Sequence, residues 1–217
     1  MNAAAPAPPA ENTKKPRRGE RREQILEAAT RLFAKYGYAE TDTQRLADDL
    51  HVGKGTLYRY FASKRELFLA AADRGMRQLC QYIDERIADI QDPLEKIARA
   101  VRAYLEFFAS HPELAELLIH ERALFKDRTK ATYFEHREAN RERWRALYRA
   151  YIAQGHIRDM PVERILDVVG DLLYGTMFTN YFSGRQKSVE AQAQDILDVV
   201  FNGIVSGDAR RRLAKEK

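Results

Sequence analysis

The chain has 217 residues, of which 45% are hydrophobic, 32% are charged and 10% are aromatic. This balance is typical of a globular protein of one or two domains, and it excludes a fibrous, collagen-like or mostly disordered chain. Lys and Arg outnumber Asp and Glu by 37 to 32, which leaves a formal net charge of +5. An excess of positive charge fits a polyanionic partner such as a nucleic acid.

Cysteine usage and hydropathy indicate the compartment. Cys80 is the single cysteine, so the chain forms no internal disulfide and matches no metal-site spacing, and a reducing compartment is expected. No run approaches the ~18 apolar residues of a membrane-spanning helix, and the N-terminus lacks the apolar core of a secretion signal. The sequence therefore predicts a cytoplasmic protein with no membrane association, no metal and no cofactor.

Residues 1 to 19 differ in composition from the rest of the chain. They contain most of the prolines together with alanines and a basic run, and too few apolar side chains to form a core, so a disordered basic tail is expected. The tail cations either help to hold a DNA backbone or serve solubility alone.

From residue 20 the apolar residues recur at helical spacing. A first helix is expected to end at Gly37, because glycine adopts the positive φ of a C-terminal cap. The stretches TQRLADDL and KGTLYRYF predict two short helices, joined by a tight turn in which Gly53 allows the sharp change of direction. Residues 20 to 66 are therefore predicted to form a three-helix domain with a helix-turn-helix.

Residues 67 to 217 are predicted to form a second, C-terminal helical domain. Ser63 and Glu66 match the S-x-x-E capping pattern, and a long helix is expected from there to about Gln91. Pro93 predicts the start of a further helix, which ends before Pro112. Other helices are expected near residues 113 to 124, 129 to 154, 162 to 183 and 189 to 206. No segment alternates with the two-residue period of a strand, so the prediction is an all-α protein of about nine helices.

The helix-turn-helix has two distinct faces. In such a motif the second helix enters the major groove of DNA, and the first helix supports it. The apolar seam between the two helices is expected to comprise Leu46, Ala47, Leu50, Val52, Leu57 and Phe61. The outward face is rich in hydrogen-bond donors and has a glycine that lets the backbone approach a base or a phosphate; it comprises Lys54, Gly55, Thr56, Tyr58, Arg59 and Tyr60.

These residues carry a resemblance. The stretch from Arg22 to Phe68, and above all GKGTLYRYFASK, resembles the DNA-binding domain of the TetR/AcrR family of bacterial transcriptional regulators. The all-α region that follows has the length and class that this family uses for ligand binding and dimerisation. The resemblance implies a homodimeric, ligand-responsive regulator, more often a repressor, that binds a palindromic operator on double-stranded DNA and is released by a small-molecule effector.

The resemblance also implies roles for individual residues. Those expected to face base edges are Gln44, Arg45, Lys54, Gly55 and Tyr58, and those expected to hold phosphates are Thr43, Thr56, Tyr60 and Lys64. Asp42 departs from the family pattern, which has Ser or Thr there, and it is expected to cap a helix rather than to contact DNA. Tyr58 and Tyr60 either contact DNA or support the apolar seam, and Lys54 and Arg59 either contact DNA or are solvated charges.

Two further sites are predicted in the C-terminal domain. An effector cavity is expected among aromatic residues, although such residues are more often core packing; the candidates are Tyr104, Phe108, Trp144, Tyr148, Tyr151 and Phe178. The last two helices have wide apolar faces with small residues at Gly170, Gly175 and Gly203. These faces predict a two-fold, four-helix dimer interface.

Two other classes of function were weighed. An enzyme is not supported, because the sequence shows no nucleophile with a base, no paired carboxylates, no phosphate-binding glycine loop and no cluster of metal ligands. A helical adaptor that binds only protein remains an alternative, but it leaves the donor-rich KGTLYRYF face without a role.

Overall fold

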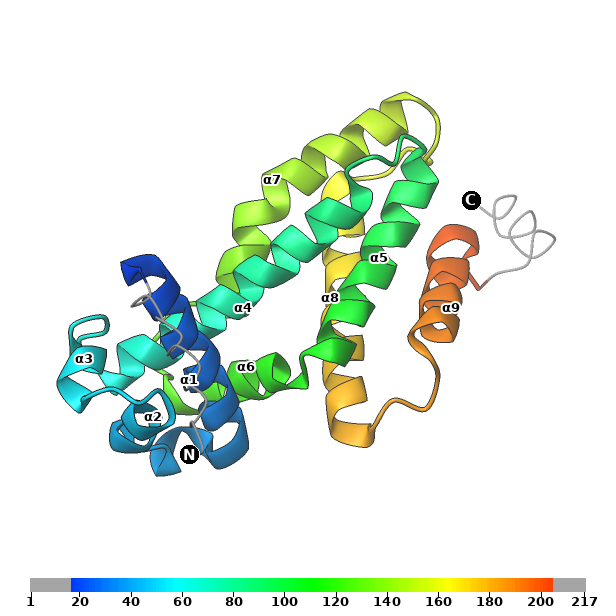
Figure 1. The fold of residues 1–217 in the computed structure, drawn as a ribbon. Coiled ribbons are helices and arrows are strands. Elements are labelled where there is room, and N and C mark those ends of the chain that lie inside the picture. The colour runs from blue at the N-terminus through cyan, green and yellow to red at the C-terminus, as the bar shows by residue number, and fades with distance from the viewer. Residues whose placement is uncertain (1–16, 205–217) are drawn as a thin grey trace, which may run out of the picture.

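The computed structural model describes residues 17–204, which contain helices and no strand. The prediction of an all-α protein with about nine helices is confirmed (Figure 1). The helices of the described residues are α1 (Arg18–Glu40), α2 (Thr43–Asp49), α3 (Lys54–Tyr58), α4 (Lys64–Ile87), α5 (Pro93–Ser110), α6 (Pro112–Leu124), α7 (Thr132–Ala153), α8 (Val162–Ser183) and α9 (Val189–Asn202).

Helices α1, α2 and α3 pack with the start of α4 around one apolar core. Phe33 and Phe68 lie at its centre with no exposed surface, and their ring centroids are 5.0 Å apart. Leu117 of α6 and Phe125, which follows α6, pack on the same core. The N-terminal helices are therefore joined to the C-terminal ones by shared apolar packing as well as by the continuous helix α4.

The seam of the helix-turn-helix forms as predicted. Leu46, Ala47, Leu57 and Phe61 are buried, and Leu50 and Val52 are partly buried against them. The side chain of Asp42 accepts a hydrogen bond of 2.9 Å from the backbone N–H of Gln44, which confirms its predicted role as a helix cap.

The expected role of Gly53 in the turn is wrong. Gly53 has φ −71°, which any residue adopts, and it precedes α3 as its N-cap. The left-handed residue of the turn is His51, with φ 52°. The backbone N–H of Val52 reaches back to the carbonyl of Ala47 at 2.9 Å and closes the turn around His51. The positive φ of the turn therefore lies at His51, two residues before Gly53, where the sequence placed the change of direction.

The prediction for Gly37 is confirmed in its conformation. Gly37 has φ 75° and interrupts the helical backbone of α1, which resumes as far as Glu40. The hydroxyl of buried Thr41 donates to the Gly37 carbonyl at 2.7 Å and lies 3.1 Å from the carbonyl of Leu32. This contact satisfies carbonyls that the interrupted helix leaves without partners.

Several helix ends differ from the predicted ones. Helix α1 begins at Arg18, inside the segment predicted as a tail; residues 1–16 and the end of the expected last helix lie outside the described residues. Helix α4 ends at Ile87, before the predicted Gln91. Helix α7 begins at Thr132 rather than near residue 129. The backbone N–H of Thr132 donates to the buried carboxylate of Glu121 at 2.9 Å, and this contact holds the start of the helix there.

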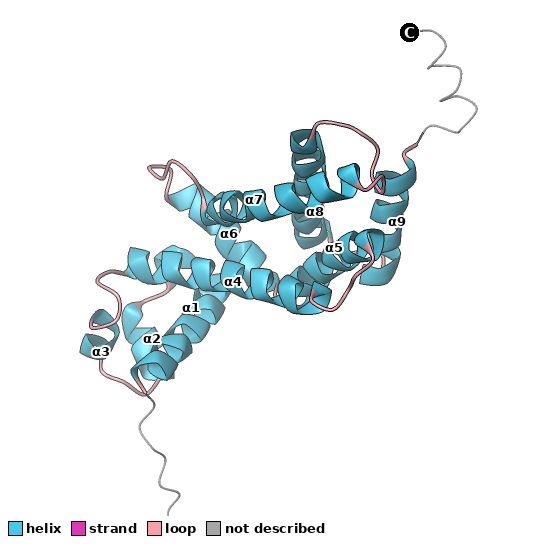
Figure 2. Cartoon of the chain, turned by 90° about the horizontal axis from the view of Figure 1, so that it is seen from above, coloured by secondary structure: helices cyan, strands magenta, loops and turns pink. Residues whose placement is uncertain are grey.

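The C-terminal helices surround α4 and α5. Helix α4 runs from the helix-turn-helix into this bundle, where α5 and α7 pack against it (Figure 1). Helix α9 stands against α5 on the side away from α7 (Figure 2). A second apolar core, which includes Leu79, Tyr104 and Met177, holds the bundle together.

A close approach of α4 and α6 at Gly75 gives a testable stability effect. A Cβ atom on Gly75 would lie 2.5 Å from Cδ1 of Leu114, which is itself buried. Overpacking costs about 1–3 kcal/mol, and the helix propensity of alanine offsets about 1 kcal/mol of it, so Gly75→Ala is expected to lower the free energy of unfolding by up to about 2 kcal/mol. Thermal unfolding should show a Tm lower by roughly 2–4 °C per kcal/mol.

The matched control is Gly55→Ala, because a Cβ on Gly55 meets no atom within 4 Å. It is expected to leave the Tm unchanged or to raise it slightly, since alanine favours a helix over glycine by about 1 kcal/mol. A Gly75→Ala protein more stable than the wild type would contradict the close packing of these helices.

Candidate nucleic-acid interface and ligand cavity

The five residues predicted to face base edges all lie on the surface. They come from α2 and α3 and comprise Gln44, Arg45, Lys54, Gly55 and Tyr58. The side chain of Tyr58 is 47% exposed although tyrosine is a large apolar residue. Exposure leaves these groups available to a partner, and it favours the contact interpretation of Tyr58 over a purely supporting one.

Local contacts orient the cations of this face. Nζ of Lys54 lies 3.5 Å from a carboxylate oxygen of Asp42, and the guanidinium of Arg45 lies 4.0 Å from the ring centroid of Tyr36. The backbone N–H of Gln44 and the charge of Lys54 hold the pKa of Asp42 below its ordinary value, so Asp42 is ionised at neutral pH. Because both partners of the Lys54 pair are exposed, a phosphate or base can displace the carboxylate at little cost.

The residues predicted to hold phosphates are less accessible. Thr43 is buried, and its hydroxyl lies 3.3 Å from the hydroxyl of Tyr58, so it positions that ring. Tyr60 is partly buried against the N-terminal core, and Thr56 is half-buried. Nζ of Lys64 donates to the carbonyl of Ala39 at 3.0 Å. The Thr43 hydroxyl, the Tyr60 ring and the Lys64 ammonium group therefore all contact other parts of the protein.

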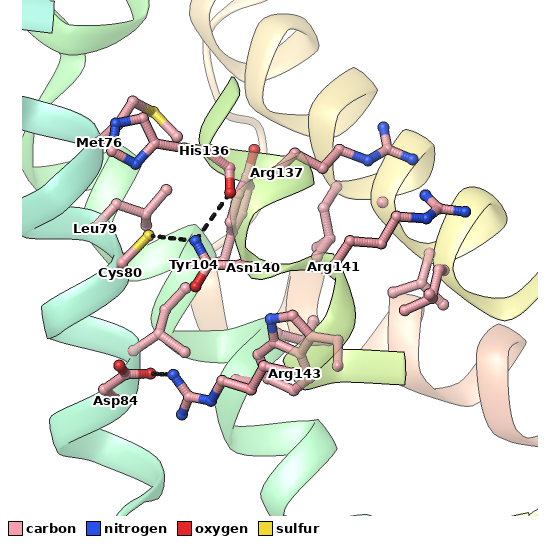
Figure 3. Close-up of a pocket in the computed structure, with 18 of the residues that line it drawn as sticks. Met76, Leu79, Cys80, Asp84, Tyr104, His136, Arg137, Asn140, Arg141 and Arg143 are labelled. Atoms are coloured by element: carbon pink, nitrogen blue, oxygen red, sulfur yellow. Dashed lines mark hydrogen bonds and ion pairs between the residues drawn. The ribbon is translucent and has the colours of Figure 1, made fainter. Parts of the chain in front are cut away.

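The C-terminal bundle contains a cavity of about 180 Å³ between α4, α5, α7 and α8 (Figure 3). Three of the six residues predicted for it, Tyr104, Trp144 and Tyr148, line its wall. Burial raises the pKa of Tyr148 to about 12, so its hydroxyl keeps its proton throughout the physiological range. The remaining wall is mainly aliphatic and includes Met76, Leu79, Ile83, Ile97, Val101 and Leu173.

The other three predicted cavity residues lie elsewhere. Phe108 lines a second, smaller cavity of about 140 Å³, and Tyr104 forms part of both walls. Tyr151 packs in a small cluster with Ile97, and the Phe178 ring stacks on Phe182 at a centroid distance of 6.0 Å. Tyr151 and Phe178 line neither of these two cavities.

Sequence reasoning missed the polar part of the cavity wall. It comes largely from α7 and comprises His136, Arg137, Asn140, Arg141 and Arg143, with Cys80 and Asp84 of α4. The signal was present in the spacing, because Tyr133, His136, Asn140, Trp144 and Tyr148 recur at three- or four-residue intervals and so share one helix face. Cys80 is half-buried in this wall.

Ion pairs tie α7 to α8 along the rim of the cavity. Arg141 binds Glu163 at 2.6 Å and Asp167 at 3.0 Å, and Arg137 binds Asp171 at 2.6 Å. Hydrogen bonds from Arg145 and Arg141 lower the pKa of Glu163 to about 2. The Glu163 carboxylate therefore stays ionised at physiological pH.

The glycines predicted for a dimer interface lie in three different settings. A Cβ on Gly170 would lie 2.7 Å from the guanidinium of Arg137, so Arg137 of the same chain covers this glycine. Gly175 is exposed with nothing within 4 Å of its Cβ position. Gly203 ends α9 with φ 72°. Close approach of a second helix is thus available at Gly175, whereas Gly170 already serves the packing of α7 on α8.

An exposed apolar stripe runs along α8 beside Gly175. Val168 is 60% exposed, Leu172 37% and Phe182 68%. Together with Gly175 they recur at intervals of three, four and seven residues and so lie on one side of the helix. Exposed apolar side chains grouped on one helix side are typical of an interaction surface.

Residues 17–204 contain neither a cluster of metal ligands nor a membrane-spanning helix. No group of three His, Cys, Asp or Glu side chains there is placed to hold a metal ion. None of the helices in this range is long and apolar enough to cross a membrane.

Two family models match the chain. Residues 25–71 match the model of bacterial regulatory proteins of the tetR family, which covers the helix-turn-helix and the start of α4. Residues 91–176 match the model of a tetracyclin repressor-like C-terminal domain, which covers α5 to α7 and part of α8.

Curated relatives carry the same description. The chain is 37% identical over 92 residues to the uncharacterized regulator YhgD of Bacillus subtilis, which is 42% of this chain and 48% of that protein. It is 26% identical over 190 residues to the transcriptional repressor KstR2 of Mycobacterium tuberculosis, covering 85% of this chain and 92% of the relative. The chain thus spans about half of the first relative and nearly all of the second. These relatives are transcriptional regulators rather than enzymes.

Solved structures share the fold over most of the chain. The fatty acid degradation regulator FadR of Bacillus halodurans superposes with a TM-score of 0.75 at 17% identity, over 87% of this chain and 98% of that one. A regulator from Saccharomonospora viridis, solved with choline, gives a TM-score of 0.72 at 22% identity, over 87% and 100% of the two chains. Both family models and the relatives agree with the resemblance in the KGTLYRYF segment, and the chain belongs to the TetR family of DNA-binding bacterial transcriptional regulators.

Proposed function

We propose that this chain is a ligand-responsive repressor that binds a palindromic operator as a homodimer and releases it when a small molecule enters the α4–α8 cavity. The observation that carries this proposal is the course of α4. The helix begins at Lys64 beside the helix-turn-helix, and its residues from Met76 to Asp84 line the cavity. A displacement of α4 by a ligand therefore reaches the DNA-binding helices directly through α1, which packs against α4.

The DNA-binding part rests on the exposed face of α2 and α3. Two such faces, related by the two-fold axis of a dimer, match the two half-sites of a palindrome. The apolar stripe of α8, defined by Val168, Leu172, Gly175 and Phe182, supports a second copy of the chain as the occupant of that surface. Burial of the stripe in a two-fold interface removes its exposed apolar area from water.

The release mechanism is a shift between two dimer arrangements. In one arrangement the two helix-turn-helix motifs are spaced to fit the operator, and in the other they are not. A ligand that binds the second arrangement more tightly lowers DNA affinity, by an amount set by its differential affinity for the two arrangements. A coupling free energy of about 1–3 kcal/mol changes operator affinity about 5- to 150-fold. Repression is favoured over activation by the similarity to KstR2, a repressor aligned over most of both chains.

Fluorescence anisotropy tests the proposal. Purified protein is titrated against the DNA upstream of its own gene, with scrambled DNA as the control and with salt varied. The expected result is selective binding with two subunits per site, together with reduced transcription from that promoter in vitro. Equal, steeply salt-dependent binding to both DNAs would show a nonspecific basic surface, and absence of binding at low salt would favour the adaptor function instead.

A further inference from the structure

We propose that the α4–α8 cavity selects a compact, uncharged and mostly apolar effector, of about the size of one substituted aromatic ring. The inference names the ligand class of the cavity and rests on the proposed function only in making that ligand an effector. It follows from the pairing of the charges in the wall, the size of the cavity and the polar atoms left without partners.

Each charged side chain of the wall already has a partner within the chain. Arg143 binds Asp84 at 2.6 Å, and His136 lies 2.8 Å from a carboxylate oxygen of Asp73. Arg137 and Arg141 extend away from the cavity toward α8 and its carboxylates, as Figure 3 shows. Arg137 and Arg141 are only 22% and 18% exposed, and each is held by two carboxylates, so an anion would have to displace a carboxylate from a largely covered guanidinium. A cation would face several arginines, and the wall therefore favours a ligand without net charge.

A pair of buried tyrosines bounds the cavity on one side, whereas on another side a neighbouring cavity of about 270 Å³ shares Asp84, Arg143 and Trp144 with it. The hydroxyls of Tyr104 and Tyr133 lie 3.1 Å apart, and both side chains are buried. Met177 packs behind this pair, 3.8 Å from the Tyr104 hydroxyl, and the second cavity begins on the far side of Tyr104. A volume of about 180 Å³ is close to the ~150 Å³ of an apolar cavity that holds one benzene molecule.

A few polar atoms in the wall are left to recognise such a ligand. Asn140 donates through Nδ2 to the His136 carbonyl at 2.9 Å and to Sγ of Cys80 at 3.4 Å. Among the described residues, Oδ1 of Asn140, the indole N–H of Trp144 and the hydroxyl of Tyr148 have no hydrogen-bond partner. The amide oxygen accepts, the indole N–H donates and the hydroxyl can do both, so these groups suit a neutral molecule with a single hydroxyl or carbonyl group.

The inference distinguishes this chain from two structural neighbours. A FadR of Bacillus subtilis was solved with stearoyl-CoA, and the Saccharomonospora viridis regulator with choline. The first ligand is a polyanion with a long chain, and the second is a quaternary cation. The paired charges and the size of the present cavity favour neither ligand.

Trp144 supplies a direct readout, because it is the single tryptophan of the chain and lies in the cavity wall. Its fluorescence is titrated in full-length, DNA-free protein with three molecules that share one ring and linker: 2-phenylethanol, phenylacetate and 2-phenylethylammonium. The neutral alcohol is expected to saturate in the millimolar range or below, with a Kd at least about tenfold lower than either ion. A charged probe that binds as tightly, or an alcohol that fails to saturate, would overturn the inference.

Two variants test the stated cause. Asp84→Asn leaves Arg143 without its acidic partner, so phenylacetate is expected to gain about tenfold in affinity while 2-phenylethanol is unaffected. Asp127→Asn is the matched control, because it breaks a pair of similar length with Arg65, neither residue lines the cavity, and it should change neither Kd. Val169→Phe fills the cavity and should weaken the alcohol at least about tenfold; unchanged binding would place the probe elsewhere.

The two proposals fail separately. Selective binding of 2-phenylethanol by a protein that does not bind its upstream DNA would leave the cavity inference standing and overturn the regulatory function. Selective DNA binding by a protein whose tryptophan fluorescence responds to none of the three probes would do the reverse.

Discussion

Gly55→Glu is expected to abolish selective DNA binding while leaving the fold intact. Position 55 is exposed on α3, and a Cβ there meets no atom within 4 Å, so the longer side chain fits without displacing the protein. In the proposed complex the new carboxylate would stand against DNA phosphates or base edges. Operator affinity should fall roughly 100-fold or more, because a base contact is worth about 1–3 kcal/mol and the dimer presents two such faces.

Anisotropy with operator DNA measures this effect, and thermal unfolding measures the fold. Ala139→Glu is the matched control, since it makes the same change of charge at an exposed position of α7. The control should retain the operator affinity of the wild type. Equal losses in both variants would reduce the effect to net charge, and an undiminished affinity of Gly55→Glu would remove α3 from the DNA interface.

Val168→Arg combined with Leu172→Arg is expected to convert the proposed dimer into a monomer. The two side chains are 60% and 37% exposed and are one turn apart on α8, so arginine fits in the monomer but places like charges together across a two-fold interface. Operator affinity should fall by about 10²- to 10⁴-fold, because the second half-site is then no longer bound at high effective concentration.

Light scattering after size exclusion gives the mass of each variant. Leu94→Arg is the control, because Leu94 is a leucine of similar exposure, 40%, on α5 and away from the stripe. It should remain dimeric and bind the operator normally. A double variant with the mass of a dimer would overturn the α8 interface and leave the stripe to another partner.

The sequence alone determined the class of the fold and the helix-turn-helix, for a local physical reason. Helical periodicity, caps such as Asp42, and the left-handed Gly37 act between residues close in the chain, and the structure confirms each of them. The apolar seam followed in the same way, because Leu46 and Leu57 lie on short helices whose faces the spacing defines. The turn itself was the exception, since hydrogen bonding rather than composition placed the positive φ at His51.

Tertiary structure determined which residues line the cavity and which predicted contact residues remain exposed. Aromatic content placed Tyr104, Trp144 and Tyr148 correctly in the wall but not Phe178, because which residues enclose a void depends on how four helices pack. Gly170 suits a helix–helix interface and Thr43 suits a phosphate contact by residue type. In the structure Arg137 covers Gly170, and Thr43 is buried beside Tyr58. The sequence states which groups exist, whereas packing decides which of them remain free to meet a partner.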